Sequence, residues 1–95
     1  MIEMLLRLYI AGFTPGARRA IENMEAIVAD LSGAPDQPKI DLEVIDVLEN
    51  PQLAEDERIL ATPLLIRRLP VPIRRLVGDL SDRERVLIGL DLRDG

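Results

Sequence analysis

The chain has 95 residues, which is long enough for one domain with a single hydrophobic core and too short for two. It contains no cysteine and no histidine, which excludes disulfides, thiol chemistry, the usual general base and the commonest metal ligands, so we expect no metal, no cofactor and no enzyme activity. The net charge of −5 argues against nucleic acid as a partner.

Charge is distributed unevenly along the chain. Residues 1–57 carry 12 acidic and 4 basic side chains, whereas residues 58–95 carry 5 acidic and 8 basic ones. The basic half suits docking on an acidic protein surface, but a solvated arginine-rich surface without a partner would have the same pattern. No stretch approaches the roughly 20 apolar residues that span a membrane, and the N-terminus lacks a signal-peptide pattern, so we expect a cytoplasmic protein.

The first half of the chain predicts a strand, a helix and a second strand. Residues 4–11 are mostly apolar on both faces of a strand, which is typical of a central position. Thr14 and Pro15 supply an N-cap and a first helical residue, and an apolar stripe follows at three- and four-residue spacing. The stripe comprises Ala17, Ala20, Ile21, Met24, Ile27, Val28 and Leu31. Residues 40–47 alternate, which indicates a strand near a sheet edge, parallel to the first strand in a right-handed βαβ unit.

The second half predicts a short helix, a hairpin and a final helix. Asn50 and Pro51 open a helix that runs to Ile59, with Leu53 and Leu60 facing inwards. Segment 61–63 introduces a strand at 64–69, and a proline-rich turn leads to another strand at 73–77. The complete order is βαβαββα. Because aromatic residues make up only 2% of the chain, we expect an aliphatic core.

The tail is ambiguous between helix and strand. Ser81 and Glu84 form a capping-box pattern, which predicts a helix from residue 82 onwards. The run VLIGLDL that follows nevertheless alternates like a strand, and Gly89 disfavours a helix by roughly 1 kcal/mol relative to alanine. We therefore expect two conformations within a few kcal/mol of each other, although an ordinary hairpin followed by a capped helix also fits.

The βαβαββα order, with Thr62-Pro63 before the third strand, resembles a thioredoxin fold. Redox members of that superfamily carry a CxxC motif where this chain has Thr14-Pro15-Gly16-Ala17, and their proline before the third strand is cis. The resemblance implies that the scaffold is retained and the redox chemistry is absent.

Three long blocks are also similar to the KaiB family of small clock proteins, which bind the ring ATPase KaiC. The blocks are LRLYIAGFTPGARRAI, VIDVLENPQLAEDERILATPLL and LPVPIRRLVGDLSDRERVLIGLDL. The resemblance implies one metamorphic domain over 1–95, with a constant half at 1–50 and a fold-switching half at 51–95. Its ground state, a tetramer or dimer, would have βαββααβ order, and its partner-binding monomer would have the thioredoxin-like order.

The resemblance also implies partners. The thioredoxin-like form would dock on the N-terminal ATPase ring of KaiC, promote the dephosphorylation phase, sequester KaiA where that protein exists, and compete with the clock histidine kinase SasA. An alternative is a thioredoxin-like adaptor outside the clock, serving a KaiC-like ATPase or a histidine kinase in stress signalling.

Site residues carry over from the family by position. The KaiC-binding set is Pro51, Gln52, Leu53, Arg58, Ile59, Ala61, Thr62, Pro63, Arg74 and Arg75. The edge strand for a second partner is Ile40, Asp41, Leu42 and Glu43. The fold-switch positions are Pro63, Pro70, Pro72, Gly89 and Asp91. Leu53 and Ile59 could instead belong to the core, and Arg74 and Arg75 could be ordinary exposed strand residues. A long loop at 32–39 departs from the family pattern.

Overall fold

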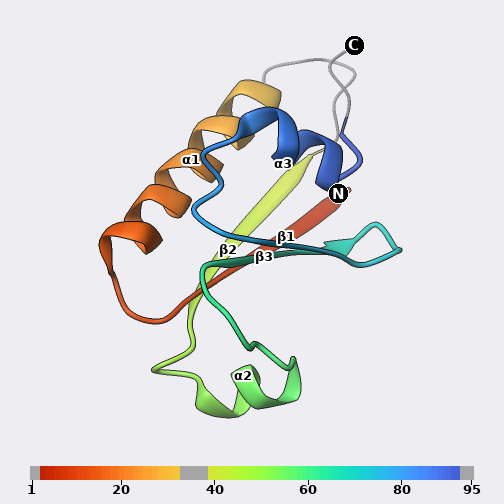
Figure 1. The fold of residues 1–95 in the computed structure, drawn as a ribbon. Helices are drawn as coiled ribbons and strands as arrows, with labels where there is room; N and C mark the ends of the chain where they lie inside the picture. Colours follow the sequence, from red (N-terminus) through yellow and green to blue (C-terminus); the bar gives the residue numbers. More distant parts are fainter. Residues whose placement is uncertain (1–2, 33–38, 93–95) are drawn as a thin grey trace.

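A computed structural model describes residues 3–32 and 39–92 of the chain, so most of the long loop expected at 32–39 lies outside the described residues. The elements follow the predicted βαβαββα order (Figure 1). They are β1 (Met4–Ile10), α1 (Pro15–Ser32), β2 (Ile40–Asp46), α2 (Pro51–Asp56), β3 (Leu64–Leu69), β4 (Arg74–Val77) and α3 (Arg83–Gly89).

The four strands form one mixed sheet in the order β2-β1-β3-β4. β1 is central, as predicted, and pairs in parallel with β2 and antiparallel with β3. β2 lies at one edge, as predicted, and β4 lies at the other. The register between β1 and β3 shifts between Leu5 and Leu6, which marks an irregularity beside Arg67 and Arg68.

The alternation of side chains along β1 divides the interior into two clusters. Leu6, Leu8 and Ile10 pack with α1 and α3 in the larger cluster, which is aliphatic as predicted. Tyr9 faces the opposite side and is fully buried with Leu64 and Ile66, beneath residues from the α2 region. α1 and α3 therefore cover one face of the sheet, and α2 contributes to the other.

α1 forms as its sequence predicts. The Ala17 amide donates to Thr14 Oγ1 at 3.1 Å, which is the expected N-cap bond. Five of the seven stripe residues are buried, and Ile21 and Val28 pack against the same cluster while partly exposed. The helix is thus held by one apolar face rather than by its intrinsic propensity.

α2 is shorter than predicted, and the inward orientation expected of Leu60 is wrong. The Ile59 amide donates to the Ala54 carbonyl at 2.9 Å and Arg58 adopts φ +55°, so a Schellman turn ends the helix before Ile59. This turn directs Ile59 towards the smaller cluster and leaves Leu60 94% exposed.

The tail is helical, but its predicted cap is wrong by one residue. Asp82, not Ser81, is the N-cap, since the Arg85 amide donates to Asp82 Oδ1 at 3.1 Å. The Ser81 amide instead donates to Asp79 Oδ1, which turns the chain one residue before the helix begins. The strand-like alternation also fails, because Ile88 is 70% exposed while Leu87 is buried.

The peptide bonds before Pro63, Pro70 and Pro72 are cis. Pro63 thus matches the cis proline expected before the third strand. None of the described helices combines the length and apolar character needed to cross a membrane.

Candidate docking surface

α2 is fastened to the sheet through its last residues. Glu57, the C-cap of α2, accepts a hydrogen bond from Arg68 on β3, with 2.7 Å between Nη1 and Oε2. Arg75 on β4 donates to the carbonyl of Glu57 at 3.0 Å. Two arginines from neighbouring strands therefore hold a helix of only six residues in place.

Asp46, the last residue of β2, connects the β1–α1 loop with the loop that leads into α2. Its Oδ1 accepts from the amides of Gly12 and Leu48, each at 3.0 Å, and its carbonyl accepts from Asn50 Nδ2 at 2.9 Å. The Asn50 side chain thus bonds to the end of β2 and makes no cap bond to α2, contrary to the prediction. Gly12 adopts φ +74°, a conformation that favours glycine, so the β1–α1 loop can approach Asp46.

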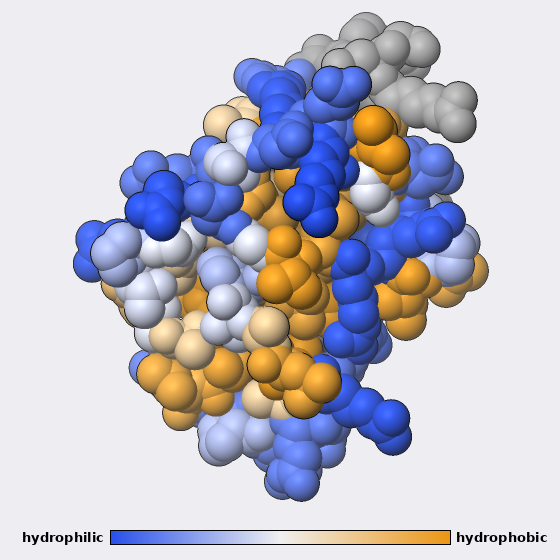
Figure 2. All heavy atoms as spheres, in the orientation of Figure 1, coloured by the Kyte–Doolittle hydropathy of each residue, from blue (hydrophilic) through white to orange (hydrophobic). Residues whose placement is uncertain are grey.

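A shallow groove of about 300 Å³ lies between the ends of β1 and β2 and the start of α2. Its lining is Ile10, Phe13, Val44, Ile45, Asp46, Glu49, Asn50 and Leu53. In open α/β sheets, this position beyond the carboxyl ends of parallel strands is where ligands commonly bind. Figure 2 shows hydrophobic side chains in the middle and lower part of the view, above a mainly hydrophilic region where Figure 1 places α2.

Three exposed apolar side chains surround this end of the molecule. Phe13 is 61% exposed, Leu48 is 68% exposed and Leu60 is 94% exposed. Exposed apolar side chains grouped at one end, with polar residues around them, are typical of a protein-binding surface. Sequence reasoning missed all three, although an isolated phenylalanine in the first strand–helix loop was an available signal.

The predicted partner-binding residues mostly meet at this end. Pro51, Gln52, Arg58 and Ala61 are exposed, whereas Leu53, Ile59, Thr62 and Pro63 are partly buried. Leu53 and Ile59 pack against the smaller cluster, so their side chains contribute to the core as well as to the surface.

Arg74 and Arg75 do not lie on one surface. They are neighbours on β4, so their side chains point to opposite faces of the sheet. Arg75 reaches α2 through Glu57, whereas Arg74 pairs in register with Arg67, whose side chain contacts the end of α3. The structure brings only Arg75 to the α2 end.

The predicted edge for a second partner is present on β2. Ile40 and Leu42 pack against the larger cluster, while Glu43 binds Arg7 with 2.9 Å between Oε1 and Nε. The hydrogen bond that Arg7 donates to Glu43 raises the pKa of Arg7 above its usual value. The free side of β2 is therefore an exposed edge with acidic side chains, able to accept another strand.

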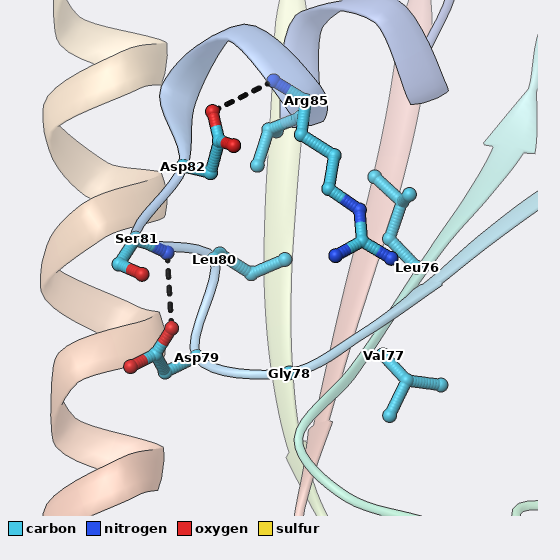
Figure 3. A pocket seen from close by; sticks show the side chains of 9 residues that line it. Leu76, Val77, Gly78, Asp79, Leu80, Ser81, Asp82 and Arg85 are labelled. Carbon is cyan, nitrogen blue, oxygen red and sulfur yellow. Dashed lines mark hydrogen bonds between the residues drawn. The ribbon is translucent and has the colours of Figure 1, made fainter.

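The predicted fold-switch residue Gly89 lies against β4. A Cβ at Gly89 would lie 2.5 Å from Leu76 Cδ2, which is closer than real side chains approach. Leu76 also lines a small pocket of about 110 Å³ between β4 and the first turn of α3 (Figure 3). Glycine therefore permits close packing of α3 on β4.

Asp91 closes α3. It adopts φ +59°, its amide donates to the Ile88 carbonyl at 3.0 Å, and the Leu92 amide donates to the Leu87 carbonyl at 2.7 Å. These two bonds define a Schellman motif with Asp91 at the position that glycine usually occupies. An aspartate at the negative end of a helix is also unfavourable electrostatically.

Side chains suited to metal binding or thiol chemistry are missing from the described residues. These residues contain no group of three acidic side chains placed to hold a metal ion, and the loop at the start of α1 has no thiol. The four-stranded sheet, with α1 and α3 on one face and α2 on the other, defines the class: a thioredoxin-like protein without the redox thiols.

Comparison with solved structures supports this class. The N-terminal domain of Synechococcus elongatus SasA superposes with a TM-score of 0.72 at 28% identity, covering 100% of this chain and 90% of that one. Mitochondrial thioredoxin 3 from Saccharomyces cerevisiae superposes with a TM-score of 0.73 at 12% identity, covering 96% and 79%, so it shows the fold alone.

The sequence comparisons give the particular family. The KaiB domain model matches residues 7–92. The circadian clock oscillator protein KaiB of Prochlorococcus marinus is 56% identical over 89 residues, covering 93% of this chain and 72% of that protein. KaiB of Synechococcus elongatus is 54% identical over 92 residues, covering 96% and 85%. The chain belongs to the KaiB family.

Proposed function

We propose that this chain is a non-enzymatic circadian clock regulator that binds the N-terminal ATPase ring of KaiC in its thioredoxin-like state. Binding would promote the dephosphorylation phase and modulate partner kinases. The observation that carries the proposal is membership of a family whose relatives are clock oscillator proteins, joined to an exposed apolar surface at the α2 end. Cytoplasmic location and binding of a KaiA-like partner at the β2 edge belong to the same proposal.

The proposal includes a second fold. The free protein would rest as a βαββααβ tetramer or dimer and would bind as a monomer with the thioredoxin-like fold described above. If the binding form is scarce, the apparent affinity falls by its fraction, and the complex forms after a delay. Two features of the described fold support a small energy gap: Asp91 occupies a glycine position, and α3 contains a glycine.

The surface can be tested without disturbing the core. Leu60→Ser removes an apolar side chain that is 94% exposed at the α2 end, and Val71→Ser removes one that is 74% exposed at the β3–β4 turn. We expect Leu60→Ser to weaken binding to the KaiC ring about tenfold or more, because central apolar contacts dominate interfaces. Val71→Ser should bind like the wild type. Equal binding by all three proteins would contradict docking through the α2 end.

Selection of the scarce fold has its own test. Asp91→Arg places a cation at the C-terminus of α3, where the helix dipole favours it, so this fold should become more populated. We expect faster association with KaiC in stopped-flow or surface-binding kinetics. Unchanged or slower association would argue against fold selection.

The second candidate function is a thioredoxin-like adaptor that never changes fold. It is favoured by the similarity to the SasA N-terminal domain at 28% identity. A two-dimensional amide spectrum, recorded with and without KaiC, separates the two proposals. One set of resonances with the topology described here in both samples would favour the adaptor, and two sets in slow exchange would favour the metamorphic regulator.

A further inference from the structure

Arg67 on β3 is the one buried charged side chain among the described residues, with 3% of its surface exposed. Its guanidinium donates hydrogen bonds to two main-chain carbonyls and not to a carboxylate. Nη1 donates to the Leu90 carbonyl at 2.6 Å, and Nη2 donates to the Pro72 carbonyl at 2.7 Å. Arg67 has no ion pair with the described residues, and its Nε has no hydrogen-bond partner among them.

The two carbonyls belong to different elements. Leu90 is the C-cap of α3, so its carbonyl is among those that the helix cannot satisfy internally, and Leu90 is fully buried. Pro72 lies in the turn between β3 and β4. We call this arrangement, Arg67 with the carbonyls of Pro72 and Leu90, the Arg67 bridge.

Each side of the bridge is incomplete without the other. In the β3–β4 hairpin, Arg67 is directly opposite Arg74, and like charges in that position repel. The Leu90 carbonyl supplies one of the two acceptors that this buried cation has in the described structure. Without Arg67, the buried Leu90 carbonyl would lose the one side-chain donor that the described structure gives it. Burial of an unpartnered charge or carbonyl is costly in both cases.

We propose that the Arg67 bridge couples the β3–β4 hairpin to the end of α3, so that residues 64–92 adopt or leave this arrangement as one unit. The bridge is thus a conformational device in which Arg67 acts as a positioning residue. Its role in timing rests on the proposed function, since the coupled segment lies in the half expected to change fold. The coupling itself does not depend on any partner.

The test is amide hydrogen exchange of the full chain, followed at two places. The Leu92 amide reports the end of α3, and the Gly78 amide, which donates to the Pro63 carbonyl at 3.0 Å, reports the hairpin. Arg67→Met keeps an apolar stem of similar length but removes the charge and the donors. We expect protection to fall about tenfold or more at both amides together, because hydrogen bonds to charged groups are the strong ones.

Arg74→Met is the matched control on the opposing strand. It removes the neighbouring exposed charge without touching either carbonyl, so protection at both amides should stay or rise. If Arg67→Met leaves both amides protected, or exposes only one of them, the coupling is wrong. If Arg67→Met does not fold, Arg67→Lys, which keeps the charge with a shorter reach, should lower protection at both amides by a smaller factor. Loss at one amide alone would again overturn the proposal.

Binding of the wild type to the KaiC ring is measured separately. If the wild type does not bind, the proposed function is wrong, but the hydrogen-exchange result still tests the coupling through Arg67. If Arg67→Met loses protection at both amides but associates with KaiC at the wild-type rate, the bridge couples the two elements but has no role in timing.

Discussion

Arg68 on β3 and Glu57 at the end of α2 form an ion pair at 2.7 Å, with both side chains less than a third exposed. The pair joins the end of α2, next to the exposed Leu60, to β3, the strand that follows the cis proline Pro63. A six-residue helix is too short to be stable alone, so the surface proposed for KaiC depends on anchors of this kind.

Glu57→Gln should therefore loosen α2. The variant keeps the shape of the side chain but removes its charge, and we expect the free energy of unfolding to fall by about 1 kcal/mol. Glu55→Gln is the control, since Glu55 is exposed on the same helix, and it should stay within about 0.5 kcal/mol of the wild type. Urea unfolding followed by circular dichroism measures both. Equal stability of the two variants would show that the ion pair does not hold α2.

Asp91→Gly should stabilise α3. Left-handed backbone costs an ordinary residue about 1–2 kcal/mol, and glycine adds about 0.5–1 kcal/mol of chain entropy, so the net gain is about 0.5–1 kcal/mol. Asp91→Asn separates geometry from charge, because it removes the charge at the end of the helix while retaining a short polar side chain. For Asp91→Gly we expect slower exchange of the Leu92 amide and a higher unfolding midpoint than in the wild type. A lower midpoint for Asp91→Gly would contradict the Schellman assignment.

Gly89→Ala has two opposing effects in this fold. Alanine favours the helix by about 0.8–1.0 kcal/mol, but its Cβ forces the Leu76 side chain to move, at about 0.5–1.5 kcal/mol. The two terms nearly cancel, so we expect a smaller increase in association rate with KaiC than Asp91→Arg produces.

The contact between these two residues can be isolated with a double-mutant cycle. In a Leu76→Ala background the obstacle to a Cβ at residue 89 is absent, and Gly89→Ala should then gain its full helix benefit. Unfolding free energies of the four proteins measure the coupling. Strictly additive effects would show that Leu76 adapts without cost.

We expect Asp79, which bonds to α1 and to the turn before α3, to make the stability of the fold sensitive to acid. Ser81, through its hydroxyl and then its amide, and Arg19 hold the pKa of Asp79 below its ordinary value of 3.8. Because the folded pKa is the lower one, the carboxylate stabilises the fold at pH values above 3.8, and this contribution is lost as the pH falls through the folded pKa.

The corresponding variant is Asp79→Asn. We expect the wild type to lose stability more steeply than Asp79→Asn between about pH 5 and pH 2. Urea midpoints measured across that range give the two slopes, with Asp30→Asn as the control for an exposed aspartate whose partner, Arg83, is also exposed. Parallel slopes for the wild type and Asp79→Asn would mean that Asp79 is not a stabilising carboxylate.

Local patterns in the sequence were sufficient for much of the fold. The two-sided apolar run of β1, the cap and stripe of α1 and the position of β2 at a sheet edge all follow from residues within one element. The missing thiols at residues 14–17 likewise predicted, before any fold was known, that thiol redox chemistry is absent. The KaiB resemblance then located the α2 end and the edge strand as candidate surfaces.

Tertiary contacts decided the rest. The tail pattern suited helix and strand almost equally, and burial of Leu87 and Leu90 in the core accompanies the helical outcome. Arg67 appeared in the sequence as one more basic residue, but its partner Leu90 is 23 residues away and meets it only when β3 and α3 are in place. Periodicity shows which face of an element is apolar. Sheet register and loop geometry determine which residues from distant elements meet there.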